Sequence, residues 1–218
     1  MSDEKKELLK HRKQKKKDWM KGILLIILLF IIAGFVLIIY GKIQGVKKQE
    51  EVVVTNVLDS IDKYGYSIND NVTSYYKEEF AKLKEMTDEE EIAKQVAKLF
   101  VIDLYSINYK INKYEITSAQ YFYSEKRDMH KDKVLDTIYK LVEDNSYEDR
   151  KQELPEVKNV EIEKSEKSKF KMGDKNVDSY VVTLKIEYVK NMGYDNEAEI
   201  TLVKDGENNI SVVKHRTK

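Results

Sequence analysis

One uncharged apolar run constrains this chain more than any other feature. Residues 22–40 form a stretch of nineteen residues without a single charge. An α-helix rises about 1.5 Å per residue, so this run spans roughly 28 Å, close to the hydrocarbon thickness of a bilayer. A cleaved signal peptide has a shorter apolar region of about 7 to 15 residues, with small residues at its cleavage site. No such site follows Tyr40. The sequence therefore predicts a retained transmembrane helix over residues 22–40, called the predicted anchor below.

The distribution of positive charge predicts the orientation of this helix. Residues 1–21 contain nine Lys and Arg, whereas only three lysines lie between residue 40 and residue 63. Because positive charge stays on the cytoplasmic side, we expect a cytoplasmic N-terminus and an extracellular C-terminal part in a single-pass protein of the cell membrane. The side chains expected at the membrane interface, with the lipid bilayer as partner, are Trp19, Tyr40, Lys16, Lys17 and Lys21. A buried helix of a soluble protein is the alternative, but a domain of this size has no need for a helix that is apolar on every side.

The composition of the exported part argues against several classes of function. Residues 41–218 hold 30 basic and 35 acidic residues, and such a balance argues against a nucleic-acid-binding surface, which carries a basic patch. The chain has no cysteine, so it has no disulfide, thiolate nucleophile or thiolate metal ligand. The length suits one domain outside the membrane. We expect four parts: a basic tail at 1–21, the helix at 22–40, a juxtamembrane stalk or helix at 41–65, and an exported domain at 66–218.

Apolar periodicity predicts helices in the first half of the exported part and strands in the second. Spacings of three and four predict a short helix over 52–65, closed by Gly65, and further helices over 73–86, 88–108 and 131–144. The helix over 88–108 opens with a predicted capping box from Thr87 to Glu90. Residues 66–72 are expected to turn, and residues 116–124 to be extended. After Pro155, strict alternation predicts strands over 157–166, 180–190, 196–204 and 210–215, with a long polar link before Tyr180 and a hairpin turn over 204–209.

These elements predict an α+β fold. Each predicted strand has one apolar face, so the sheet is covered on one side and wet on the other. Short links between the last three strands favour an antiparallel meander. The preceding helices must cover its apolar face. We therefore expect an N-terminal transmembrane helix followed by one domain in which helices pack on a curved antiparallel sheet.

Asp103 is the exception to the apolar pattern of its helix. On a helical wheel it lies within the stripe formed by Ile92, Val96 and Leu99. A buried carboxylate is costly unless it is paired, hydrogen-bonded, protonated or facing a cavity. The sequence leaves open a partner inside the domain (a tyrosine hydroxyl, a lysine or a strand N–H), a ligand pocket, and catalysis. We expect the first, with a neutral hydrogen-bond partner.

No other residue predicts catalysis, a metal or a cofactor. His11, His130 and His215 are expected at the surface, and none of the common nucleophile, phosphate-binding or metal-binding motifs is present. Residues 205–209 are rich in side-chain oxygens but lack the spacing of a calcium loop. We therefore expect a protein that is not an enzyme and has no cofactor.

The order of elements resembles a known family. Helices followed by a curved sheet at the C-terminus are similar to the cone-shaped fold of the nuclear transport factor two superfamily. With a short cytoplasmic tail and one anchor, the chain resembles the bitopic assembly factors of type IV secretion and conjugation systems in low-GC Gram-positive bacteria. The stretch where a fingerprint of the family is expected is residues 100–125, "FVIDLYSINYKINKYEITSAQYFYSE". The resemblance implies a non-enzymatic scaffold that binds copies of itself and other membrane-complex proteins.

Three functions remain in competition at this point. The favoured one is a membrane-anchored scaffold or assembly protein that acts by protein–protein interaction in a cell-envelope complex. The alternative is an exported sensor or ligand-binding domain with a pocket near Asp103. An exported enzyme is the third and the weakest. A cavity inside the fold would favour the ligand-binding domain, and an open sheet edge or an exposed apolar patch would favour the scaffold.

Overall fold

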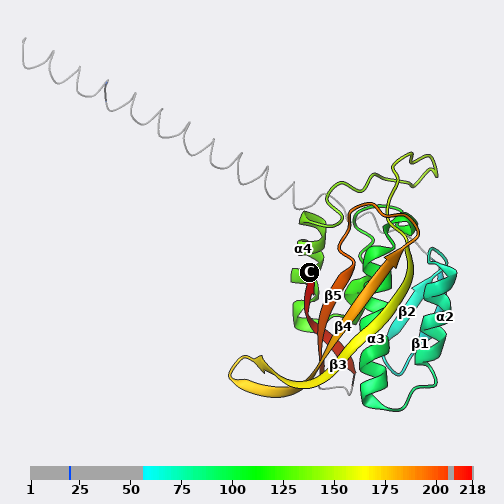
Figure 1. Ribbon diagram of the computed structural model, residues 1–218. Coiled ribbons are helices and arrows are strands. Elements are labelled where there is room, and N and C mark those ends of the chain that lie inside the picture. The colour runs from blue at the N-terminus through cyan, green and yellow to red at the C-terminus, as the bar shows by residue number, and fades with distance from the viewer. Residues whose placement is uncertain (1–19, 21–55, 206–208, 218) are drawn as a thin grey trace, which may run out of the picture. The chain divides into compact units, whose positions relative to one another are not determined.

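Figure 1 shows the computed structural model, which describes Met20, residues 56–205 and residues 209–217. The chain divides into two compact units, Met1–Val52 and Val53–Lys218, and the fold below is that of the second. The predicted anchor and its interface side chains at positions 16, 17, 19, 21 and 40 lie outside the described residues. Within the described part, no helix is both long and apolar enough to cross a membrane.

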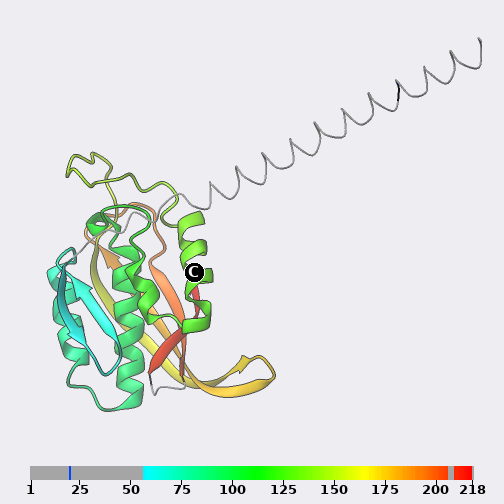
Figure 2. The ribbon, with the colours of Figure 1, turned by 180° about the vertical axis from the view of Figure 1, so that it is seen from behind.

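The domain is α+β, as the sequence predicts. Its elements follow in the order β1 (Val57–Ile61), β2 (Tyr66–Asn69), α2 (Ser74–Leu83), α3 (Glu89–Tyr105), η1 (Ile107–Tyr109), η2 (Thr117–Tyr121), η3 (Ser124–Lys126), α4 (Arg127–Asp136), β3 (Val157–Met172), β4 (Lys175–Tyr188), β5 (Glu197–Lys204) and β6 (Ile210–Thr217). Figure 1 shows the last four strands as a curved sheet with α3 behind it, and Figure 2 shows the same sheet from the side of α3. The prediction of helices on a curved antiparallel sheet is confirmed.

The sheet is an antiparallel meander in the order β3-β4-β5-β6. On β4, Val182, Leu184 and Ile186 are buried, whereas the intervening Lys185 and Glu187 are exposed. The buried faces of β4 and β5 match because Val182 pairs with Ile200 and Leu184 with Ala198. This alternation puts the apolar face against α3 and leaves the other face wet.

The β3–β4 hairpin is longer than the sequence predicts. The segment before Tyr180, expected as a polar link, continues both strands until Met172 pairs with Lys175. Gly173 has φ 59°, as the first central residue of a two-residue II′ hairpin turn requires. Pairing with β5 begins only at Ser179, so the strands beyond it form a two-stranded ribbon that projects from the sheet (Figures 1 and 2). Periodicity missed this ribbon because water reaches both of its faces.

Helix α3 supplies the main cover of the sheet. Its first turn is capped by Asp88, whose side chain accepts hydrogen bonds from the backbone N–H groups of Glu90 and Glu91. The predicted cap, Thr87, is wrong by one residue. Along α3 the stripe predicted from Ile92 onward is buried, as are most residues of its last three turns.

Two predictions are wrong, one for a segment before α3 and one for a segment after it. The sequence predicts a helix over residues 52–65, but Val57–Ile61 is a strand that pairs with Tyr66–Asn69 through a turn in which Gly65 has φ 66°. The expected boundary between positions 65 and 66 thus falls inside a hairpin of the compact unit. Spacings of three and four among four valine, leucine and isoleucine residues occur by chance in a short strand, so the pattern misled.

Residues 116–124, expected to be extended, form η2 and a single bridge between Phe122 and Val212. The fourth helix begins and ends earlier than predicted, at Arg127 and Asp136, and Leu141 beyond it is 79% exposed.

Candidate functional site

Asp103 is buried in α3 and paired with a cation. Its carboxylate is 1% exposed and forms an ion pair with the amine of Lys110, whose side chain is 2% exposed. The hydroxyl of Thr117 donates to the same carboxylate oxygen over 2.7 Å and accepts from the Lys110 amine over 2.6 Å. A compact triad of acid, amine and hydroxyl is thus closed inside the domain.

The loop after α3 brings Lys110 back to the helix. The chain leaves the helix at Ser106, passes through η1 and returns so that Lys110 faces Asp103. Arg150 fixes this loop from outside, because its guanidinium donates to the backbone carbonyls of Asn108 (2.7 Å) and Lys110 (2.9 Å). Sequence reasoning missed both Lys110 and Arg150, since neither belongs to a periodic stretch. A buried acid followed seven residues later by a lysine was the only available signal.

Two tyrosines lie deep beside the triad. The hydroxyls of Tyr76 and Tyr121 are hydrogen-bonded to each other at 2.5 Å. Burial raises the pKa of both phenols well above the ordinary value, and the negative charge of Asp103 raises the pKa further. The second carboxylate oxygen of Asp103 has no hydrogen-bond partner among the described residues. Both phenols therefore remain neutral. The Lys110 amine and the Thr117 hydroxyl bind only one of the two carboxylate oxygens of Asp103.

The interior next to Asp103 has almost no free space. The hollow that Asp103 shares with Tyr76 and Lys110 has a volume of about 10 Å³. Such a volume holds about one water molecule and no larger ligand. Asp103 itself therefore lines no hollow large enough for a ligand, and a ligand pocket near it stays a hypothesis. The expected neutral partner is present as the Thr117 hydroxyl, but a buried cation, which was not expected, accompanies it. The partner inside the domain is a lysine, which was among the open alternatives.

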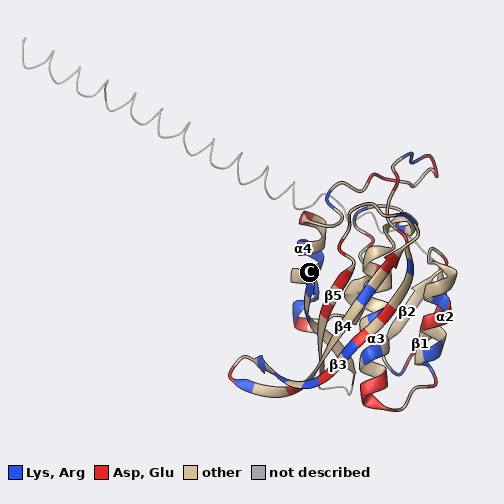
Figure 3. Cartoon of the chain, in the orientation of Figure 1, with Lys and Arg blue, Asp and Glu red and all other residues tan. Residues whose placement is uncertain are grey.

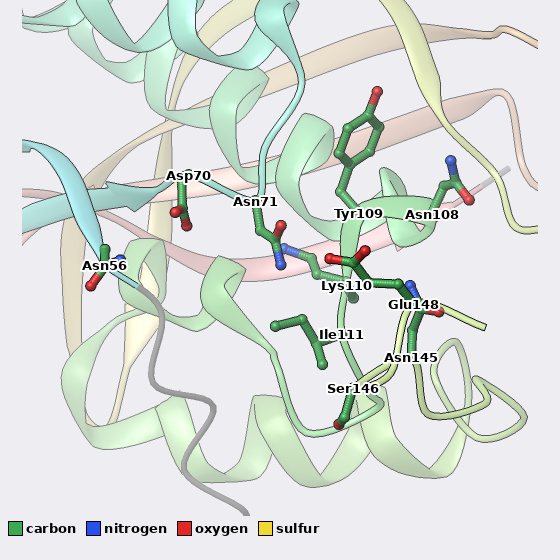
Figure 4. Close-up of a pocket in the computed structure, with 10 residues that line it drawn as sticks. All are labelled: Asn56, Asp70, Asn71, Asn108, Tyr109, Lys110, Ile111, Asn145, Ser146 and Glu148. Atoms are coloured by element: carbon green, nitrogen blue, oxygen red, sulfur yellow. The ribbon is translucent and has the colours of Figure 1, made fainter. Parts of the chain in front are cut away.

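A larger cleft opens on the other side of Lys110. It has a volume of about 440 Å³ and is lined by four separate segments, which Figure 4 shows together. Its lining residues are Asn56, Asp70, Asn71, Asn108, Tyr109, Lys110, Ile111, Asn145, Ser146 and Glu148. Four asparagines and a serine give this surface both donors and acceptors.

The walls of the cleft are held in place by contacts behind them. Buried Glu115 accepts a hydrogen bond from the Asn69 side chain (3.0 Å) and another from the backbone N–H of Ile111 (2.7 Å). At the rim, Glu148 has φ 58°, which is uncommon for a residue with a side chain and occurs at ligand clamps as well as in turns. These contacts tie the end of β2 and the loop after α3 into one rigid wall.

Two of the three histidines are not at the surface, where the sequence predicts them. His11 lies outside the described residues. His130 is buried and stacks on Phe122, with ring centroids 4.2 Å apart, and burial lowers its pKa to about 4. His215 is half-buried, with Nε2 3.3 Å from the Tyr105 hydroxyl, and burial lowers its pKa to about 4 as well. Both imidazoles are therefore neutral at pH 7.

His130 and His215 line a second groove, of about 310 Å³, with Lys133 and apolar side chains. Among the residues that the structure describes, no group of three or more His, Asp or Glu side chains is placed to hold a metal ion.

Comparisons with known proteins return nothing for this chain: no protein-family model, curated protein or solved structure matches it.

Proposed function

We propose that this chain is a single-pass membrane protein whose exported domain works by binding other proteins, as a scaffold or assembly factor in a cell-envelope complex. The predicted anchor and the excess of Lys and Arg before it support a cytoplasmic N-terminus and an extracellular domain. The order of helices before a curved C-terminal sheet supports the resemblance to assembly factors of type IV secretion and conjugation systems.

The observation that carries this proposal is the open edge of the sheet. Strand β3 stands at the end of the strand order, and its outer half continues into the projecting ribbon (Figure 1). An exposed edge of this length is a template for strand addition by another chain. The interior near Asp103, by contrast, is filled. Of the two discriminating features, the open edge is present, and the hollow described at Asp103 is too small for a ligand.

A second candidate is a small polar ligand in the cleft beside Lys110. Its volume lies in the range of ligand pockets, about 300 to 1,000 Å³. The lining is mainly amide, carboxylate and hydroxyl groups, which suits a molecule rich in hydroxyl or amide groups rather than an apolar one. In this version of the ligand-binding hypothesis, the ligand binds in the cleft on the far side of Lys110 and does not contact Asp103.

The scaffold proposal is tested by photocross-linking in cells of the source organism. A photoreactive residue replaces Lys171 in the ribbon of the full-length chain, and the control carries it at Lys82 on α2, which is also exposed. We expect a defined envelope protein to be captured from position 171 and not from position 82. If position 171 captures nothing, or the same products as position 82, the ribbon is not a docking element and the proposal fails.

A further inference from the structure

The charges along the free edge of β3 are complementary to those of a second, antiparallel copy of the same strand. We propose that this edge pairs antiparallel with the same edge of a second copy of the chain, so that two four-stranded sheets become one. The inference rests on the proposed function, because it names one partner of the exported domain. Three features of the strand support it: an open backbone, an unsatisfied serine, and residues of opposite charge on either side of that serine.

The backbone edge is open where the pairing would occur. Tyr75 covers β3 at one point only, where its hydroxyl accepts a hydrogen bond from the backbone N–H of Val160 (2.9 Å). From residue 161 to Met172, no backbone group bonds to a described segment other than β4. Each unpaired N–H and C=O on this edge is a site at which a second strand can bond.

Ser165 marks the centre of the pairing. Its hydroxyl is buried and has no hydrogen-bond partner among the described residues. Two antiparallel copies of one strand are related by a two-fold axis, and a residue on that axis lies opposite itself. If that residue is Ser165, the two hydroxyls come within reach of each other, as in cross-strand serine and threonine pairs. The second copy then supplies the missing partner.

The residues on either side of Ser165 have opposite charges. With Ser165 on the axis, Lys164 of each copy lies opposite Glu166 of the other, so the attraction occurs twice. Both side chains point to the wet face of the sheet, because they pair across β4 with Thr183 and Val181. In the single chain these two side chains form an ion pair with each other at 2.7 Å, but they are 61% and 55% exposed, so each can exchange that partner for its counterpart in the second copy.

Residues farther from the axis also bring opposite charges of the two copies near each other, over a longer distance. Glu161 and Glu163 precede the centre, whereas Lys167, Lys169 and Lys171 follow it, and both signs of charge occur along β3 (Figure 3). Antiparallel pairing lays Glu161 and Glu163 of one strand beside these lysines of the other, while Lys158 and Lys164 leave residues 157–164 with no net charge. The bulge before residue 164 changes which face the earlier side chains occupy, so these outer charges act by proximity and not as opposed pairs. An edge with lysine alone would repel its copy.

The absence of cysteine from the sequence permits a direct test by disulfide cross-linking. Full-length chains carrying Ser165→Cys, or Ser168→Cys as the matched control, are oxidised in membranes and resolved without reductant. A residue on the axis lies within the Cα–Cα limit of a disulfide, about 7 Å. Residue 168 is separated from its copy by six residue steps, roughly 20 Å. We expect covalent dimer from Ser165→Cys only. Equal dimer from both, or none from Ser165→Cys, refutes the pairing.

Charge reversal tests the register independently. On the Ser165→Cys background, Lys164→Glu or Glu166→Lys puts like charges opposite each other twice, and we expect dimer formation to fall about tenfold. The double reversal restores the opposite charges and is expected to restore the yield. Circular dichroism of each variant checks that the fold is kept. Unchanged cross-linking in the single reversals refutes this register.

The outcomes separate this inference from the proposed function. A defined envelope protein captured from position 171, with no Ser165→Cys dimer, refutes the self-pairing and leaves the scaffold proposal standing. A dimer without any other captured protein supports the self-pairing and contradicts the wider scaffold role.

Discussion

Asp103→Asn is the sharpest test of the buried triad, because it removes the charge and keeps the shape. In the folded domain the Lys110 amine then loses its only buried counter-charge among the described residues, while the amide oxygen and the Thr117 hydroxyl still accept hydrogen bonds from it. The change therefore leaves an uncompensated cation in the interior rather than a cavity. The same logic predicts that Lys110→Met leaves an uncompensated carboxylate.

The size of the effect follows from burial. Both side chains are at most 2% exposed, so solvent does not screen the stranded charge. Removing one partner of a buried pair costs about 3 to 5 kcal/mol, whereas losing a hydrogen bond to a neutral group costs about 1 to 2 kcal/mol. Because Thr117 still contributes a hydrogen bond, we expect about 3 kcal/mol for Asp103→Asn. Replacing both partners at once, Asp103→Leu with Lys110→Met, removes both charges and should recover most of this loss.

The assay is urea unfolding of the unit Val53–Lys218, followed by far-ultraviolet circular dichroism. Tryptophan fluorescence is unsuitable because the only tryptophan, Trp19, precedes this unit. The matched control is Asp178→Asn, whose carboxylate also pairs with a lysine, Lys169, but is 88% exposed. We expect that control to lose at most about 0.5 kcal/mol, as surface ion pairs do.

A loss below about 1 kcal/mol for Asp103→Asn, or a loss equal to that of Asp178→Asn, would refute the argument from the buried ion pair. A double replacement as unstable as the single ones would show that the triad acts through shape and not through charge.

Three further predictions concern stability and processing. His130 and His215 have folded pKa values of about 4 against the ordinary histidine value of 6.5, so the unfolded chain binds more protons between these values. Stability is then full above about pH 6.5 and falls as pH drops towards 4, by roughly 3 kcal/mol for His130 alone, and His130→Leu should flatten this dependence in urea titrations at several pH values. A chain of residues 53–218 should unfold cooperatively on heating with or without chelator, whereas residues 66–218, which lack β1, should melt at a lower temperature; equal midpoints would make β1 dispensable. Mature protein in the membrane fraction should keep its original N-terminal residues on N-terminal sequencing, and soluble protein that begins near residue 41 would mean that the predicted anchor is a signal peptide.

The fold was predictable where local patterns are strong. On α3, the buried stripe from Ile92 to Phe100 repeats with the helical period, and β4 alternates from Val182 to Ile186, so period alone identified both. The hairpin of β1 and β2 was not predicted, because the spacing of apolar residues over five positions cannot distinguish a strand from a helical turn. The ribbon of β3 and β4 was not predicted for another reason. Water reaches both of its faces, and apolar–polar alternation appears only where one face is buried and the other exposed.

The candidate sites depend on contacts that no local pattern contains. Asp103 stood out in the sequence as a polar residue within an apolar stripe, but its partner comes from a loop whose path is set by Arg150, forty residues beyond Lys110. The cleft combines four segments that no motif links. His130 and His215 line one groove only because β6 ends beside α4 (Figures 1 and 2). Side chains distant in sequence become neighbours only when the sheet and helices pack.

The sequence by itself determined the α+β class, the burial of Asp103 and the apolar faces of the last strands, whereas the anchor and its orientation stay predictions from the sequence. These depend on composition and on short-range period, which are properties of neighbouring residues. Only the tertiary structure decided that Asp103 pairs with Lys110, that the interior beside it is filled, and that the open cleft lies on the other side of that lysine. It also decided that β3 ends the sheet, because which strand lies at an edge depends on the order in which all four strands pair.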